Sequence, residues 1–363
     1  MKKPILLYFP YDLNSRESGS RVRPNKIIEN FKKLEYDFIL IKGNSYKRKK
    51  IIEKIIKNKM DFLFCYSEPS TYPVHPFIDY RMYYYLKKMK IPTGIFYRDA
   101  YWKFNLYFQK RGIKKLELFL RYRLDFYLFN IFAKIIFFPT DSMRKLFKVK
   151  TKTAILPPGG EEFFLENKIT HKKFRGIYVG GISTRYGINI LLDAFEIVNQ
   201  RQKIELIIVC RKNEYESLDF ATKEKIKKNW VRLYHISGNK LAGLYQDSDF
   251  GVIPRIRDEY NNLAMPIKLF EYLSYGIPII ATNCYEMGKF IKKYQCGVLC
   301  EDNAESLADS INKIGSNKNF FANLSNNAKK VLLDDNLWTD RVMSIVQTMT
   351  RIASKNNSTI MQK

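Results

Sequence analysis

The sequence predicts an α/β fold made of two domains, each with a parallel sheet covered by helices on both faces. Three observations lead to this fold. The chain has 363 residues, more than one hydrophobic core usually supports. Short apolar runs alternate with longer helical patterns throughout, as expected for strand–helix–strand units. The alternation stops at Leu156–Gly160, which contains two prolines and two glycines, and then restarts, so this break predicts a domain connector.

The strand candidates are short apolar runs bounded by polar or turn residues. They are residues 5–9, 38–41, 62–66, 93–97 and 135–138 in the first half, and 176–179, 204–209, 250–253, 279–281 and 297–299 in the second. We therefore expect domains at 1–160 and 161–335. A helical pattern runs from Ala328 to Ile352, and we expect the segment 336–363 to form a helix that can pack back on the first domain and ends in a frayed polar tail.

Positive charge is concentrated in the first half. The formal net charge is +27, and residues 1–160 hold 34 Lys and Arg against 13 Asp and Glu, which leaves only +6 for the rest. Such a field attracts anionic membrane surfaces, phosphorylated substrates or nucleic acid. The sequence contains no recognisable nucleic-acid-reading motif, so we do not expect nucleic acid as a partner.

Cysteine usage and the apolar segments bear on location. Five cysteines without a CxxC pair, and three histidines, indicate neither a disulfide framework nor a zinc site. The first ten residues lack a signal-peptide core, and no run is long enough to span a bilayer. We expect a cytoplasmic protein, with peripheral binding at the inner face of the plasma membrane left open. The basic, amphipathic segment Lys110–Arg123 fits a helix on a membrane surface or a half-buried helix equally well.

The first domain offers a candidate anion loop after its first strand. It contains Gly19, Arg21 and Arg23, ahead of a helix expected from Lys26. Small residues let backbone N–H groups approach an anion, and arginines add charge-assisted hydrogen bonds. An ordinary polar connection would look the same, so both interpretations stay open.

The second domain offers a similar loop between a strand and a helix. Gly180 and Gly181 would let the chain pass close to a diphosphate, Ser183 follows them, and Arg185 could neutralise a leaving group. The spacing is not that of the dinucleotide fingerprint.

The most specific segment is Asn262–Thr282. Pro266 suits the first turn of a helix, and Lys268 and Glu271 lie on one side of that helix. The helix N-terminus and Lys268 could bind an anion, while Glu271 could accept hydrogen bonds from ribose hydroxyls. The alternative is a structural ion pair between Lys268 and Glu271.

These segments resemble the GT-B glycosyltransferases of the family-4 type, most strongly from Phe174 to about Ile314. The resemblance implies a GT-B fold, two Rossmann-like domains facing a central cleft, and a retaining enzyme that uses a nucleotide-diphosphate sugar. It also implies roles for residues. The catalytic group would be Arg185, Lys268, Arg98 and Asp99; the donor-binding group Gly180, Gly181, Ser183, Ala264, Met265, Pro266, Glu271 and Glu259; and the acceptor-side group Gly19, Arg21 and Arg23.

Four positions depart from the family pattern. The first of two family glutamates falls on Leu263, for which nearby Glu259 could substitute. In the diphosphate loop, the family's Arg and Lys fall on Gly181 and Tyr186. The family histidine that reaches the donor sugar falls on Arg98.

The expected reaction is transfer of a sugar to a hydroxyl acceptor, in the synthesis of a cell-envelope polysaccharide or glycolipid. The acceptor would be a lipid-linked or phosphorylated saccharide. We expect no cofactor and no metal, because the only DxD spacing, Asp247–Asp249, precedes a buried strand and resembles an ordinary turn of this family. A sugar-nucleotide epimerase and a non-catalytic GT-B partner protein remain alternatives; donor turnover without an acceptor, or no turnover at all, would distinguish them.

Overall fold

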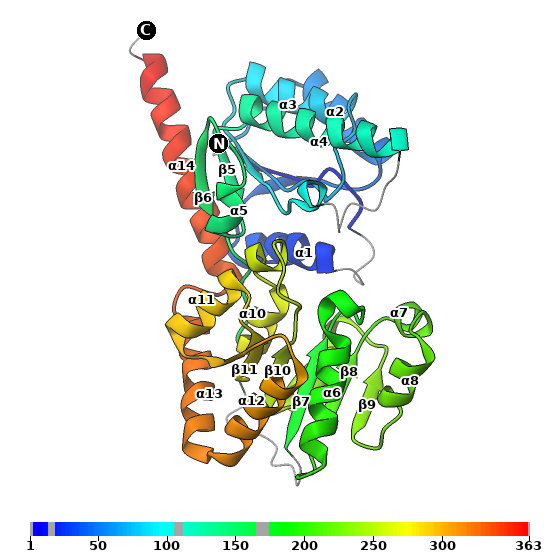
Figure 1. The fold of residues 1–363 in the computed structure, drawn as a ribbon. Helices are drawn as coiled ribbons and strands as arrows, with labels where there is room; N and C mark the ends of the chain where they lie inside the picture. The colour runs from blue at the N-terminus through cyan, green and yellow to red at the C-terminus, as the bar shows by residue number, and fades with distance from the viewer. Residues whose placement is uncertain (1–2, 14–18, 105–111, 165–173, 362–363) are drawn as a thin grey trace. The chain divides into compact units, whose positions relative to one another are not determined.

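The computed structural model describes residues 3–13, 19–104, 112–164 and 174–361. Its contacts divide the chain into two compact units (Figure 1). The first unit comprises residues 1–157 and 338–363, and the second comprises residues 158–337. The C-terminal helix thus belongs to the first unit by its contacts.

The first unit is built on a six-stranded parallel sheet in the order β2-β1-β3-β4-β5-β6. Its strands are β1 (Ile5–Tyr8), β2 (Phe38–Ile41), β3 (Cys65–Ser67), β4 (Thr93–Phe96), β5 (Ile135–Phe138) and β6 (Lys152–Ile155), and its helices are α1 (Gly19–Lys33), α2 (Ser45–Lys57), α3 (Asp79–Lys88), α4 (Gly112–Phe132), α5 (Asp141–Lys145) and α14 (Trp338–Met361). Helix α14 packs against α1. The strand order changes direction at β1, because β2 lies on one side of β1 and β3 to β6 follow on the other.

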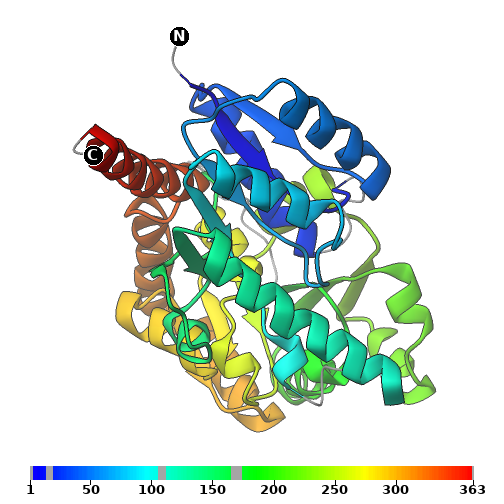
Figure 2. The ribbon, with the colours of Figure 1, turned by 90° about the horizontal axis from the view of Figure 1, so that it is seen from above.

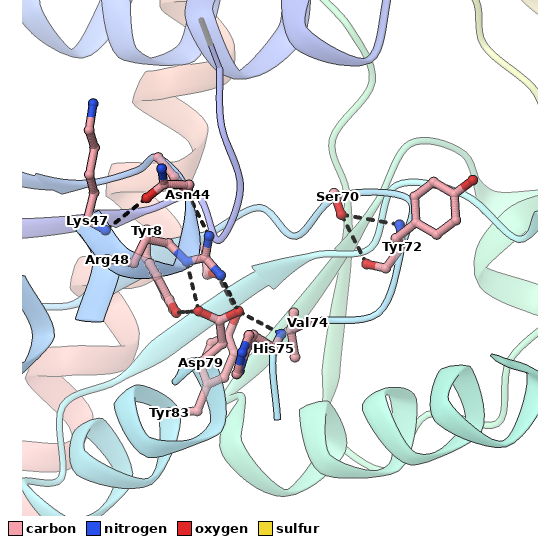
Figure 3. Close-up of polar contacts among 12 residues, drawn as sticks. Tyr8, Asn44, Lys47, Arg48, Ser70, Tyr72, Val74, His75, Asp79 and Tyr83 are labelled. Atoms are coloured by element: carbon pink, nitrogen blue, oxygen red, sulfur yellow. Dashed lines mark hydrogen bonds and ion pairs between the residues drawn. The ribbon is translucent and has the colours of Figure 1, made fainter. Parts of the chain in front are cut away.

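A buried ion pair anchors the connection from β3 to α3 (Figure 3). The Arg48 guanidinium donates to both oxygens of Asp79, at 3.0 and 2.9 Å. The Tyr8 hydroxyl and the His75 backbone N–H also donate to this carboxylate. Asp79 is fully buried, so these donors replace the water that a charged carboxylate would otherwise need.

The second unit has a six-stranded parallel sheet in the order β12-β11-β10-β7-β8-β9. Its strands are β7 (Arg175–Val179), β8 (Glu205–Val209), β9 (Val231–Tyr234), β10 (Phe250–Ile253), β11 (Ile279–Thr282) and β12 (Gly297–Cys300), and its helices are α6 (Ile188–Asn199), α7 (Lys212–Glu216), α8 (Phe220–Ile226), α9 (Ala242–Gln246), α10 (Ile267–Ser274), α11 (Tyr285–Tyr294), α12 (Ala304–Ser316) and α13 (Lys318–Leu333). Two apolar cores lie on its two faces, one with α6 and α12 and the other with α10, α11 and α13.

The two parallel sheets confirm the predicted α/β fold, but two strands and two helix boundaries differ from the prediction. Strands β6 and β9 were missed. Both are edge strands with half-exposed or exposed residues, so neither shows a buried apolar run. The helical pattern over 328–352 belongs to two helices that are separated by residues 334–337. Helix α1 already begins at Gly19 and contains Pro24, so the predicted loop before Lys26 is wrong from Gly19 onward.

Within the described ranges, no helix is both long and apolar enough to cross a bilayer.

Candidate functional site

The strand order of the second unit reverses between β7 and β10. In open α/β sheets, ligands bind beyond the carboxyl ends of the strands at such a reversal. The loops 180–187 and 254–266 leave the sheet there. They are in contact, because a Cβ added to Gly187 would lie 1.5 Å from the Pro254 carbonyl oxygen. Since Gly187 also has φ of +75°, only glycine fits this crossing.

Gly180 brings the backbone close to a lysine. It has φ of +142°, and a Cβ there would lie 2.5 Å from Lys268 Nζ. The next residue, Gly181, accepts a hydrogen bond through its carbonyl from the Tyr178 hydroxyl. Gly180 of the predicted diphosphate loop therefore lies directly beside Lys268.

Lys268 is held by aromatic rings. Its Nζ lies 4.3 Å from the ring centroid of Tyr178 and 6.0 Å from that of Tyr186. Among the described residues it has no hydrogen bond or ion pair, so the predicted alternative, a pair with Glu271, is absent. Glu271 instead accepts a hydrogen bond from the Tyr245 hydroxyl at 3.0 Å. Burial, and next the positive charge of Arg255, lower the pKa of Lys268 to about 7.

Three cations surround the ring of Tyr186. Arg185 donates to the Tyr186 hydroxyl at 2.9 Å, and its Cζ lies 4.7 Å from the ring centroid. Arg255 Cζ lies 5.8 Å from the same centroid. We call Arg185, Arg255 and Lys268 the cation cluster. Two of its members were predicted, and Arg255 was missed although it follows a predicted buried strand and Pro254, at the edge where ligands bind.

The other predicted donor-side residues lie on the same two loops. Ser183 is exposed and precedes the 3₁₀ turn Thr184–Tyr186. Pro266 is the N-cap of α10, and the half-buried Ala264 and Met265 precede it. Glu259 is exposed on the loop after β10.

In the first unit, a buried glutamate that the sequence analysis missed holds two predicted arginines. Glu68 follows β3 and is fully buried. Arg98 Nη2 donates to Glu68 Oε1 at 2.8 Å, and Arg23 Nε lies 3.4 Å from Glu68 Oε2. Arg23 also lies 3.8 Å above the Phe96 ring and donates to the Pro157 carbonyl. These contacts hold Arg23 inside the unit, where it supports Glu68.

Asp99 lies beside a small cavity of the first unit. The Thr71 hydroxyl donates to its carboxylate at 2.9 Å, and burial raises the pKa of Asp99 to about 6. The cavity, of about 20 Å³, is also lined by Tyr122 and Asp125, which gives room for about one water. Arg21 is half-buried on α1, and Gly19 begins that helix.

Asp247 and Asp249 serve the scaffold. Asp249 accepts from the Arg175 backbone N–H at 2.9 Å, and Asp247 pairs with the Arg175 guanidinium. Over the part of the chain that the structure describes, no three His, Cys, Asp or Glu side chains are grouped so that they could bind a metal.

Comparison with known proteins gives a family match and solved structures of the same fold. Residues 160–331 match the family model of glycosyl transferases group 1. No curated protein matches the chain in sequence. Sucrose-phosphate synthase from Thermosynechococcus elongatus is similar in structure, with a TM-score of 0.72 and 13% identity over 98% of this chain and 100% of that one.

Two further solved structures share the fold. A glycosyltransferase from Rickettsia africae has a TM-score of 0.70 and 14% identity, over 97% of this chain and 99% of that one. Anabaena HepE, in complex with UDP and glucose, has a TM-score of 0.66 and 12% identity, over 96% of this chain and 99% of that one. At these identities the likeness shows the fold, and the fold is GT-B.

Proposed function

Because residues 160–331 match the family model of glycosyl transferases group 1, we propose that this protein moves a sugar from a nucleotide-diphosphate donor to a hydroxyl acceptor, with retention at the anomeric carbon. The observation that carries the proposal is the cation cluster beside Gly180. Lys268 and Arg255 lie close enough for one charge to lower the pKa of the other group. A dianionic diphosphate bound between them would relieve that repulsion.

The same groups suit the chemistry of transfer. Negative charge develops on the departing diphosphate, and preorganised cations stabilise it most in a site that excludes water. Arg185 and Lys268 would supply this stabilisation. Glu271, oriented by the Tyr245 hydroxyl, would accept hydrogen bonds from the ribose hydroxyls.

For the first unit we propose roles at the reacting sugar and on the acceptor side. Arg98 and Asp99 follow β4 at the carboxyl edge of their sheet, where ligands of such sheets bind. We propose that they act at the reacting sugar, with Gly19 and Arg21 on the acceptor side. Arg23 acts indirectly, because it holds Glu68, which in turn holds Arg98.

A thermal-shift screen tests the donor proposal. UDP, GDP, ADP, CDP and dTDP, and their glucose conjugates where available, are added in buffer with EDTA. We expect nucleotides of one base to stabilise the folded protein by RT ln(1+[L]/Kd) and so to raise its melting temperature.

We propose that the cations replace a metal, so Mg²⁺ or Mn²⁺ should not be needed for the shift or for transfer. If no nucleotide shifts the melting temperature, or EDTA abolishes turnover until metal is added, the corresponding proposal is wrong.

The first unit carries a separate feature, an apolar stripe on α4. Its members, each between 38% and 87% exposed, are Ile113, Leu116, Leu120, Leu124, Tyr127 and Ile131. They recur every three or four residues, so they share one face of the helix. Tyr122, Asp125 and Phe129 are buried on the other side. Of the apolar residues in the predicted amphipathic segment, Leu116 and Leu120 thus face outward, whereas Leu118 and Phe119 are half-buried.

The charge beside this stripe favours an anionic lipid surface. Each residue of an α-helix is rotated by about 100° from the one before it, so Arg121 and Arg123 lie on opposite sides of the stripe. Figure 2 shows α4 with no other segment of the first unit drawn over it. Arg121 also lies 4.0 Å from the exposed Glu117. An exposed apolar stripe flanked by arginines is typical of helices that lie in a membrane interface. We propose that α4 docks on the membrane that carries a lipid-linked acceptor.

Flotation with vesicles tests this docking. We expect the protein to float with phosphatidylglycerol-containing vesicles and much less with pure phosphatidylcholine. Each buried leucine contributes about 1.5–3 kcal/mol, so the double variant Leu120→Glu, Leu124→Glu should bind more than tenfold more weakly. Phe220→Glu, which alters an apolar side chain 77% exposed in the second unit, is the matched control and should float like the wild type. Equal flotation of the double variant would refute the docking surface.

A further inference from the structure

Arg255 has a buried hydrogen-bond donor without an acceptor. It follows β10 and Pro254, and its Nη1 donates to Asn261 Oδ1 at 3.3 Å. Asn261 is 2% exposed and is itself fixed, because its Nδ2 donates to the Ile256 carbonyl. Arg255 Nε is shielded from solvent, and no described residue accepts a hydrogen bond from it. A buried N–H without a partner is unfavourable, so the guanidinium is held in place with part of its donor capacity unused.

Arg255 forms no ion pair with a carboxylate among the residues that the structure describes; its Nη1 donates to the neutral side chain of Asn261. Arg255 faces the Tyr186 ring, which Lys268 also approaches. The carboxylates of Glu214 and Glu271 are the acidic groups that interact with Lys268, but Glu214 pairs with Arg211 at 3.4 Å and Glu271 accepts from Tyr245. Neither carboxylate forms a hydrogen bond or ion pair with Arg255 among the described residues.

The directions from which the donors come indicate the shape of the missing ligand. Gly180 contributes backbone from the loop after β7, Lys268 comes from the first turn of α10, and Arg255 comes from the loop after β10. These three segments meet at one edge of the sheet. A single phosphate could satisfy one or two of them, whereas a diphosphate presents two linked anionic groups to donors that lie apart.

We propose that Arg255 donates hydrogen bonds to the diphosphate of the nucleotide donor and is a binding residue of the site alongside Lys268. The inference rests on the proposed function, because it adds a binding residue for the same diphosphate. The loop 180–187 contains a single cation, Arg185. Arg255 adds a second guanidinium from the loop after β10, and a guanidinium can bind phosphate oxygens with two N–H groups at once.

The test compares Arg255→Gln and Arg255→Lys with a control from the same loop. Arg257 lies two residues further on, is exposed, and pairs with Glu301, so Arg257→Gln removes an equal charge away from the cation cluster. Calorimetry measures the affinity for a nucleoside diphosphate and for its parent nucleoside. The pair is UDP and uridine, unless another nucleoside diphosphate stabilises the wild type more. Melting of the unliganded variants checks that they fold.

The expected pattern is selective. Arg255→Gln should bind the diphosphate at least tenfold more weakly and the nucleoside within about twofold of the wild type, since hydrogen bonds to charged groups are the stronger class. Arg255→Lys should be intermediate, and Arg257→Gln should match the wild type. Equal diphosphate affinity in Arg255→Gln, or an equal loss for the nucleoside, would overturn the assignment.

The controls separate this inference from the donor proposal. If Arg255→Gln does not fold, wild-type diphosphate affinity in Arg255→Lys overturns the assignment instead, because lysine lacks the Nε donor. A wild-type protein that binds no nucleoside diphosphate would refute the proposed function itself, and this inference with it. A wild-type protein that binds one, with unchanged affinity in the Arg255 variants, refutes only the role of Arg255.

Discussion

Replacing Lys268 by methionine is expected to lower turnover about 100- to 1,000-fold while leaving the fold intact. This is the typical loss when one preorganised electrostatic donor is removed from a site where negative charge develops. Methionine keeps an unbranched apolar stem against the Tyr178 ring, so packing should be largely preserved. The assay is transfer from the nucleotide sugar identified by the thermal-shift screen.

The pH dependence of binding gives a second readout for Lys268. With a pKa of about 7 in the unliganded protein, Lys268 is mostly charged at pH 6 and mostly neutral at pH 8. A bound diphosphate favours the charged form and raises this pKa. Binding above pH 7 should therefore take up a proton, and affinity should fall as pH rises, by at most about tenfold per unit. Lys268→Met should remove this proton uptake.

Calorimetry at pH 8, in two buffers of different ionisation enthalpy, measures the uptake directly. Lys292→Met, at an exposed position on α11 of the same unit, is the control and should behave like the wild type. Normal turnover in Lys268→Met, with proton uptake unchanged, would remove Lys268 from the site.

The second large effect concerns stability. Arg48→Met should lower the free energy of unfolding of the first unit by about 3–5 kcal/mol, because it leaves the fully buried Asp79 carboxylate without its cation. The Tyr8 hydroxyl and the His75 N–H still donate to Asp79 (Figure 3), but they carry no positive charge. Urea unfolding followed by circular dichroism measures the loss.

A control variant and a double variant test this explanation. Lys49→Met removes a cation next to Arg48, from an exposed pair with Glu53 at 3.9 Å, and should cost less than about 1 kcal/mol. The double variant Arg48→Met, Asp79→Asn should recover part of the stability, because asparagine carries no charge to bury. A destabilisation by Arg48→Met no larger than that by Lys49→Met would show that the buried pair contributes little.

The part of the fold that the sequence predicts is the part with buried apolar runs. Ten of the strands were found because they are central or strongly apolar, whereas β6 and β9 lie at sheet edges and mix exposed with apolar residues. Helix α1 begins at Gly19, whereas the helical pattern was predicted only from Lys26. Pro24 is the sixth residue of this helix, beyond the first turn in which proline is normally tolerated, so a helix through it is not expected from sequence.

The site was predicted only where spacing along the chain carries the information. Gly180, Lys268 and Glu271 belong to local patterns, and the structure brings Gly180 and Lys268 together. Arg255 and Glu68 have no such pattern. Their importance comes from partners far away in sequence, such as Tyr186 for Arg255 and Arg23 for Glu68, and only tertiary structure reveals these contacts. The aromatic support of Lys268 was missed for the same reason.

The central claim is that the cation cluster and Gly180 bind a diphosphate. A crystal structure of the protein with the nucleoside diphosphate selected by the thermal-shift screen tests it most directly. We expect phosphate oxygens within hydrogen-bonding distance of Lys268 Nζ and the Arg255 guanidinium, and the ribose hydroxyls at Glu271. A diphosphate bound elsewhere, with Lys268 and Arg255 still unliganded, would contradict the account.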